Sequence, residues 1–410
     1  MTGAADFGGV DLALAVVVLA LAALLLRRAV REAAFWQATV TPLASIIGSG
    51  FLIAAPLLAG VAGAHAVLAV LGIVLLSLWI GSALRFTIRC ENAAGGTLDK
   101  SLSQRLERVS DLALAFAYLV SIAFYIRLMS GFVLTGLHHY TLFNANVVAT
   151  GVLTFIGLYG LRRGLHGLER LETYSVTMKL AIIGALLLGL VFHDLRTGFS
   201  LDGIHEWAAG PWERLRLLGG MLLIVQGFET SKYLGEAYPA ELRIRSMRVA
   251  QLLAGVIYVV FVALILPLLA RQSVGPDETA IIELTRGVTP LLPLMLIVAA
   301  VMSQFSAAVA DTIGAGGVVA VETRRRWPTR VFYPGIMLLS IGLIWRADIF
   351  EIVALASRAF ALYYGLQSIL AARLAVDNCT GAHRARCVAS YLLLAALMLL
   401  VALFALPAHG

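Results

Sequence analysis

Long apolar stretches separated by short polar connections repeat along the whole chain. Twelve of these stretches are long enough, or nearly so, to cross about 30 Å of hydrocarbon as a helix, because a helix rises about 1.5 Å per residue. They cover residues 10–26, 36–60, 65–87, 109–137, 144–161, 174–193, 214–236, 247–270, 287–320, 329–346, 348–372 and 387–406. The pattern therefore predicts an all-α membrane protein with about twelve transmembrane helices.

The second apolar stretch is interrupted by the sequence Ile46-Ile47-Gly48-Ser49-Gly50-Phe51. Two glycines around a serine weaken a helix, and hydrocarbon offers no water to the backbone groups that a break exposes. A break at this depth persists only where something polar uses those groups, which in transporters is usually the substrate or a coupling ion. The stretch 214–236 carries a second interruption, Gln226-Gly227-Phe228-Glu229-Thr230-Ser231.

The two interruptions occupy corresponding positions in the chain. When the first span is set aside, helices 2–6 and 7–11 form two groups of five, and an odd number of spans gives the second group the opposite orientation. Inverted repeats of this kind place the substrate between their first helices. We therefore expect an extra N-terminal helix with a basic linker (1–34), a first repeat (35–195), a second repeat (196–373) and a C-terminal helix (374–410).

Composition and charge agree with this interpretation. A chain with 60% hydrophobic residues, 13% charged residues and a mean hydropathy of +0.90 is not a soluble domain. The net charge of +7 is explained by where the basic residues lie. Of the 31 Lys and Arg residues, 21 fall in connections on one side of the membrane and 6 in connections on the other. The positive-inside rule makes the first side cytoplasmic and puts both termini outside, so we expect no nucleic-acid partner.

The sequence predicts neither a metal site nor a cofactor. The cysteines, Cys90, Cys379 and Cys387, lie in or beside basic connections without metal-ligand spacing, and we interpret them as reduced cytoplasmic thiols. Five histidines of the outer connections also lack such spacing; they are His65, His138, His139, His193 and His205. A phosphate-binding glycine loop, a nucleophile elbow and a soluble domain are all missing, so we expect no enzyme activity.

A broken helix offers free N–H groups where its second half begins and free C=O groups where its first half ends. A zwitterion satisfies both. The first set of groups suits a carboxylate and would come from Ile47, Gly48, Ser49 and Gly50. The second set suits an amine and would come from Val225, Gln226 and Gly227, beside Phe228. The alternative is that the glycines only permit close helix packing.

Several of these residues resemble motifs of the amino acid–polyamine–organocation (APC) transporters. The segment 46–52, followed by Pro56, resembles the first-helix motif of that family, and Gly227-Phe228-Glu229, followed by Glu236 and Tyr238-Pro239, is similar to its sixth-helix signature. Val225 stands where members often have an aromatic gate. The resemblance implies a leucine-transporter-type fold of two inverted five-helix repeats, and an amino acid or a related amine as substrate.

Charged residues inside the predicted spans are the candidates for coupling. Lys179 resembles the fifth-helix lysine of proton-coupled and ion-independent members, and the resemblance implies that its ammonium lies against the first break with Ser303 or Ser306. The alternative is a lysine that snorkels to the inner interface. Unpaired charges are costly at this depth, so Glu229 is expected to pair with Lys232, and Arg127 with Glu229 or Asp311.

These observations predict a secondary transporter that works by alternating access in a lipid bilayer, the inner membrane of a bacterium. We expect an amino acid or related amine as the small-molecule substrate and protons as the coupling ion, and we make no prediction of oligomeric state. A cation transporter or channel on the same fold is one alternative. A membrane sensor or partner subunit that transports nothing is another.

Overall fold

The structure is a computed structural model that describes residues 8–48, 50–95, 101–137, 139–204, 206, 210–271, 284–285, 287–346 and 349–406. The described residues form helices and no strand. These are α1 (Gly9–Leu25), α2 (Arg28–Arg31), α3 (Ala34–Ile46), α4 (Gly50–Ala62), η1 (Gly63–His65), α5 (Ala66–Ala93), α6 (Ser101–Gly136), α7 (Leu142–Thr197), α8 (Pro211–Gly220), η2 (Met221–Val225), η3 (Phe228–Tyr233), α9 (Ala240–Arg271), α11 (Leu292–Glu322), η4 (Thr329–Val331), α12 (Tyr333–Arg346), α13 (Ile349–Asn378) and α14 (Gly381–Phe404).

Each of the twelve predicted spans corresponds to helical elements of the structure: some to one helix or part of one, and others, such as 36–60 and 214–236, to two or three. Seven helical segments of the described residues are long and apolar enough to cross a membrane, and α1 is a shorter apolar helix. The predicted spans 144–161 and 174–193 are the two arms of α7, which bends where Gly164 takes φ +63°. A residue with a side chain is strained at that angle, so the glycine permits the bend.

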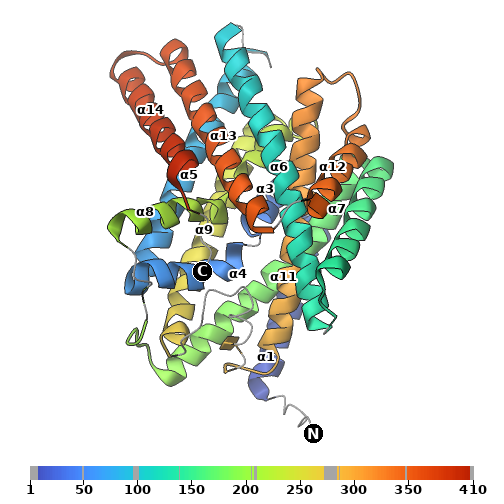
Figure 1. Cartoon of the computed structure of the whole chain (residues 1–410), viewed down its shortest axis with the longest axis vertical. Helices are drawn as coiled ribbons and strands as arrows, with labels where there is room; N and C mark the ends of the chain where they lie inside the picture. Colours follow the sequence, from blue (N-terminus) through green and yellow to red (C-terminus); the bar gives the residue numbers. More distant parts are fainter. Residues whose placement is uncertain are drawn as a thin grey trace.

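Both predicted breaks are present. The span 36–60 is divided into α3, which ends at Ile46, and α4, which begins at Gly50. The span 214–236 is divided into α8, η2 and η3, with residues 226 and 227 outside any helix. Figure 1 shows α3 and α4 in the middle of the bundle, and α3 packs against α7, α9, α11 and η3.

The two broken helices cross at very short range. Gly227 takes φ +116°, and a Cβ at this position would collide with the Ser45 side chain and lie 2.8 Å from the Ile46 nitrogen. A Cβ at Gly50 would lie 2.9 Å from the Ile224 Cα. Glycine is therefore required on both helices for the breaks to come together, so these glycines do permit close helix packing.

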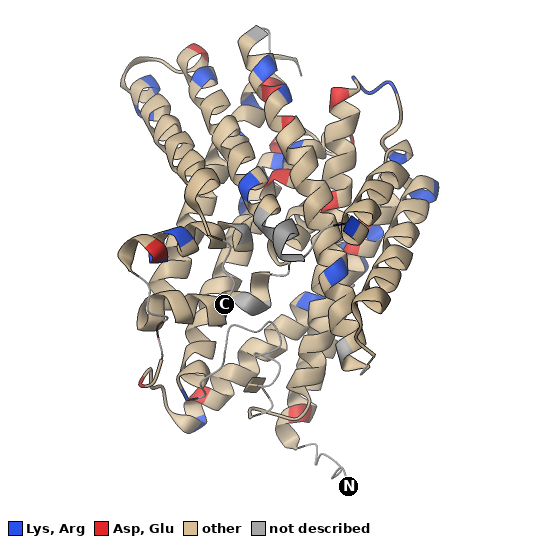
Figure 2. Ribbon diagram, viewed as in Figure 1, with Lys and Arg blue, Asp and Glu red and all other residues tan. Residues whose placement is uncertain are grey.

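Helices at the edge of the bundle add to this core. α1 packs against α7, and the Leu14 side chain lies where α7 has only a glycine, Gly189. Asp11 of α1 is buried, and its carboxylate accepts a hydrogen bond from the Leu291 N–H (3.3 Å) beside the start of α11. Figure 2 shows more Lys and Arg toward the end of the molecule opposite the N-terminus, which agrees with the charge asymmetry of the sequence.

Candidate functional site

Lys179 lies at the end of the first half of the first broken helix. Its side chain projects from the middle of α7 and is fully buried. The ammonium donates hydrogen bonds to the carbonyl oxygens of Ala44 (2.9 Å) and Ile47 (2.6 Å) and to the Ser306 hydroxyl (2.9 Å). Carbonyls at a helix C-terminus carry the negative end of the helix dipole, which favours a cation there. The lysine does not reach the surface of the protein.

Two serines of α11 complete this cluster. The Ser303 hydroxyl lies 2.6 Å from the Ile47 oxygen and 3.1 Å from the Gly48 oxygen, and the Ser306 hydroxyl lies 3.1 Å from the Ser303 oxygen. The structure thus brings together Lys179, Ser303, Ser306 and the end of α3, as the family resemblance implied. Ser49, the central residue of the first break, lies outside the described residues.

The second break is lined by polar and aromatic groups. The Gln226 amide nitrogen lies 3.0 Å from the Tyr125 hydroxyl, while its buried oxygen has no hydrogen-bond partner among the described residues. Phe228 is buried and stacks on Tyr364, with ring centroids 5.4 Å apart and planes at 10°. The Val225 oxygen accepts from the Ser77 hydroxyl at 3.4 Å. Among the groups predicted to meet an amine, the Gln226 side chain therefore has a free acceptor.

Tyr258 of α9 joins the two breaks. Its buried hydroxyl lies 3.0 Å from the Ile46 oxygen, at the end of α3, and 2.9 Å from the Ile224 oxygen, in η2. Nothing in the local sequence around Tyr258 marks it, since it is one aromatic residue in an apolar helix. Only the packing of α9 across both breaks makes it a candidate functional residue.

The prediction of ion pairs for Glu229, Arg127 and Asp311 is wrong, because these residues bind other partners. Glu229 instead accepts from the Gly227 N–H (2.9 Å) and the Tyr364 hydroxyl (2.7 Å). Arg127 donates to the Ile344 oxygen (3.3 Å). Asp311 of α11 accepts hydrogen bonds from Ser45 (2.8 Å) of α3 and from Ser121 of α6. Neutral donors thus bind both oxygens of Asp311 and one oxygen of Glu229, while the second Glu229 oxygen is buried without a hydrogen-bond partner among the described residues. A sequence rule based on opposite charges does not detect such neutral donors.

Lys232 pairs with two other carboxylates. Its ammonium lies 3.1 Å from the Glu91 carboxylate of α5 and 3.2 Å from that of Glu107 on α6. Glu91 and Glu107 lie in the segment that the sequence pattern assigned to a connection, and α5 and α6 extend beyond the predicted spans to include them. A cavity of about 740 Å³ leads from this cluster to the surface arginines Arg324 and Arg325.

Two further buried carboxylates lie on α7, on the same helix as Lys179. The Glu172 carboxylate accepts from the Thr41 hydroxyl of α3 (2.7 Å), and the Glu169 carboxylate accepts from the Tyr238 hydroxyl (2.9 Å). His166, which is exposed, lies 3.1 Å from Glu169. The sequence pattern did not indicate these residues, because they lie in the predicted connection between the spans 144–161 and 174–193, which the structure shows as part of α7. They place acidic groups on α7 between Lys179 and an exposed histidine.

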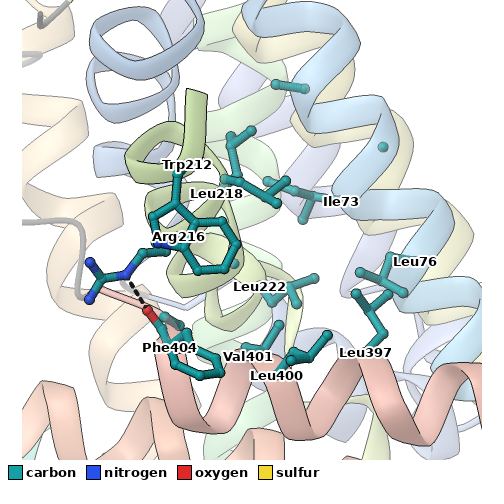
Figure 3. Close-up of a pocket in the computed structure, with 15 residues that line it drawn as sticks. Ile73, Leu76, Trp212, Arg216, Leu218, Leu222, Leu397, Leu400, Val401 and Phe404 are labelled. Atoms are coloured by element: carbon teal, nitrogen blue, oxygen red, sulfur yellow. Dashed lines mark hydrogen bonds between the residues drawn. The ribbon is translucent and has the colours of Figure 1, made fainter. Parts of the chain in front are cut away.

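A second cavity, of about 280 Å³, is apolar, and its lining contains none of the residues 46–51 or 226–231 at the two breaks. Figure 3 shows it between α5, α8 and α14, with Trp212 and Phe404 at one end. The Arg216 guanidinium there donates to the Phe404 oxygen at 2.7 Å (Figure 3). Its lining offers no set of polar groups for a transported solute, so the candidate functional site is the crossing of the two breaks.

The fold and the paired breaks define a membrane transporter of the leucine-transporter type. The family model described as APC superfamily transporter matches residues 28–405, so the chain belongs to the APC superfamily of transporters. The extra helix α1 precedes the matched region. An uncharacterized protein of Aquifex aeolicus (strain VF5) is 47% identical over 341 residues, which are 82% of this chain and 83% of that protein.

Two solved structures share the fold at low identity. The Eremococcus coleocola manganese transporter, in complex with an aromatic bis-isothiourea substituted compound, is 14% identical, with a TM-score of 0.60 over 90% of this chain and 85% of that one. Mhp1, a nucleobase-cation-symport-1 family transporter with bromovinylhydantoin bound, is 13% identical, with a TM-score of 0.51 over 90% of this chain and 91% of that one. Both likenesses concern the fold alone.

Proposed function

We propose that this protein is a secondary transporter that moves an amino acid or a related amine by alternating access, coupled to protons through Lys179. The observation that carries the proposal is the position of the Lys179 ammonium against the broken end of α3 and Ser306 of α11. This single side chain connects α3, α7 and α11, so a change in its charge acts on three helices at once.

Protonation alters how strongly these helices are held together. A charged ammonium has three donors and forms charge-assisted hydrogen bonds, which are about twice as strong as neutral ones. A neutral amine has one donor fewer and no charge. Loss of the proton therefore weakens the connection of α7 and α11 to α3, and release of α3 permits the bundle to reopen on the other side.

The groups around the two breaks support a zwitterionic substrate. α4 begins at Gly50, and the N–H groups at a helix N-terminus favour a carboxylate. The Gln226 amide oxygen is a buried acceptor without a partner among the described residues and suits an ammonium. The first-half carbonyls of Ile47 and Gly48 are already used by Lys179 and Ser303. The proposed substrate site thus lies between the start of α4 at Gly50 and the Gln226 side chain at the end of the first half of the second broken helix.

The proposed orientation follows the charge asymmetry of the sequence. The connections that hold most of the Lys and Arg face the cytoplasm of a bacterial cell, and both termini lie outside the inner membrane. The ion pairs of the Lys232 cluster then close the inner side of the pathway, and the cavity lies beside them.

The test is uptake of labelled amino acids and amines into proteoliposomes under a pH gradient. We expect uptake by the wild type, and a loss of at least about tenfold, or 1.4 kcal/mol, for Lys179→Ala and Gly48→Leu. Met178→Ala is the matched control, since Met178 is the exposed neighbour of Lys179 on α7. Transport that survives both changes contradicts the site assignment.

Two further measurements separate the alternatives. Uptake of Mn²⁺ in place of amines would favour a cation transporter, although the described residues at the breaks contain no group of three ligands drawn from His, Cys, Asp and Glu. If no solute is transported and none changes the thermal stability of the protein, the results favour the alternative function of a membrane sensor.

A further inference from the structure

Three metal-ligating side chains meet where α13 ends and α14 begins. Cys379 follows the last residue of α13, and His383 and Cys387 lie one turn apart at the start of α14. One ligand atom from each residue lies within 4.8 Å of the other two. The spacing along the sequence did not indicate this group, because Cys379 lies just beyond the end of α13 while the other two residues lie on α14.

The distances fit a tetrahedral thiophilic ion. A zinc ion holds sulfur at about 2.3 Å and nitrogen at about 2.0 Å, which puts a tetrahedral sulfur–nitrogen pair about 3.5 Å apart. The Cys387 sulfur lies 3.6 Å from Nε2 and 3.8 Å from Nδ1 of His383. Two cysteines and one histidine are also the ligand types that soft and borderline metals select.

The local fold holds the three residues in place. Only two residues, Cys379 and Thr380, connect the two helices, and the Cys379 N–H remains bonded to the Ala375 oxygen (3.1 Å). Gly381 takes φ +56°, which turns the chain sharply into α14. Cys379 is buried, Cys387 is partly exposed and His383 is exposed, so an ion can enter from solvent and find a sheltered sulfur.

We propose that Cys379, His383 and Cys387 form a binding site for a thiophilic metal ion of the Zn²⁺ type. Each cysteine releases its thiol proton as its sulfur binds, so two thiolates balance the two positive charges of the ion beside Arg384 and Arg386. Three protein ligands leave the fourth position to water. A bound ion fixes the end of α13 to the start of α14. Tyr364, in the middle of α13, contacts Glu229 in the second break. This inference does not depend on the proposed substrate or on Lys179.

The experiment uses the full chain, purified in detergent with a non-thiol reductant and freed of metal by a chelator. Titration with Co²⁺ should give a thiolate-to-cobalt charge-transfer absorption that saturates at one ion per chain and disappears when Zn²⁺ is added. Cys379→Ser, Cys387→Ser and His383→Ala should each weaken binding at least about tenfold, as loss of even outer partners does. Cys90→Ser is the control, since Cys90 is a free thiol outside the group.

A second measurement follows the reactivity of the Cys387 thiol itself. Zn²⁺ should slow alkylation of Cys387 in the wild type and in Cys90→Ser, and should not slow it in His383→Ala. The proposal is overturned if the cobalt complex lacks the charge-transfer band, if Cys379→Ser binds as tightly as the wild type, or if Zn²⁺ protects Cys387 equally in His383→Ala.

Discussion

The Lys179 ammonium supplies a positive charge at the carbonyl end of α3, where the helix dipole favours a cation. Its three partners come from α3 and α11, while its own backbone belongs to α7. A buried lysine without such acceptors would be very costly in hydrocarbon, so the broken helix and the lysine stabilise each other. The cost of the break and the cost of the charge are thus reduced by the same contacts.

Removal of the Ser306 hydroxyl tests this arrangement more gently than removal of the lysine. Ser306→Ala takes away one of the three acceptors, and we expect a loss of about 1–3 kcal/mol of stability because the ammonium stays buried with a donor unused. Thermal unfolding in detergent measures the change. Thr154→Ala is the control: Thr154 is an exposed residue of α7 whose hydroxyl bonds to its own helix. Equal stability of the two variants would contradict the described contacts.

Gly227 offers a second test at the scale of one residue. Gly227→Ala places a methyl group against Ser45 and forces a residue with a side chain into φ +116°. We expect a loss of about 2–4 kcal/mol, the sum of overpacking and left-handed strain. Gly151→Ala on α7 is the matched control. Its Cβ meets nothing within 4 Å, so this variant should be neutral or slightly more stable in the same unfolding assay.

The elements differ in how well the sequence predicts them. The long apolar stretches locate every long helix. Glycine beside polar residues locates both breaks, because hydrocarbon penalises each interruption of a helix strongly. The ends of helices are less visible: α5 and α6 run on to include Glu91 and Glu107, and α7 joins two predicted spans. Polar residues near a helix end are equally compatible with a loop, so their pairing with Lys232 depended on the three-dimensional arrangement.

We expect the Lys232 cluster to hold the proposed pathway closed on its side of the protein. Lys232→Met leaves the partly exposed carboxylates of Glu91 and Glu107 without their cation, so the two negative charges repel each other. We expect the closed arrangement to weaken, so that Gln226→Cys, in a chain whose native cysteines are serines, reacts faster with a maleimide.

The matched control combines Lys232→Met with Glu91→Gln and Glu107→Gln. Without the carboxylate charges the cluster no longer repels itself, so the labelling rate of Gln226→Cys should return toward that of the parent. A labelling rate that is unchanged in Lys232→Met alone would show that the cluster does not close the pathway.

At the scale of the whole molecule, α1 is an addition to the family core. The family match begins at residue 28, and α1 contacts the core through α7 and through the bond from Leu291 to Asp11. Its position was predictable from hydropathy, since residues 10–26 form a separate apolar stretch. Its contacts were not, because the glycines of α7 that receive its leucines look like ordinary packing positions.

We expect Asp11→Ala to lower stability and leave transport intact. The change removes an acceptor from the Leu291 N–H, and lost caps of this type cost about 1 kcal/mol. Leu12→Ala is the control, since Leu12 is exposed on the same helix. Thermal unfolding and uptake should be measured on the same preparations. A fall in uptake with unchanged stability would place α1 in the transport cycle.

The Tyr258 hydroxyl has one hydrogen and two carbonyl oxygens within bonding distance, one on each broken helix. It can satisfy one of them fully at a time, and separation of the helices leaves the other dependent on solvent. In the proposed cycle, separation of the two helices therefore admits water to the carbonyl oxygen that the Tyr258 hydroxyl leaves, and their return expels it. The rate of transport should consequently fall under osmotic stress, even when the substrate and proton gradients are held constant.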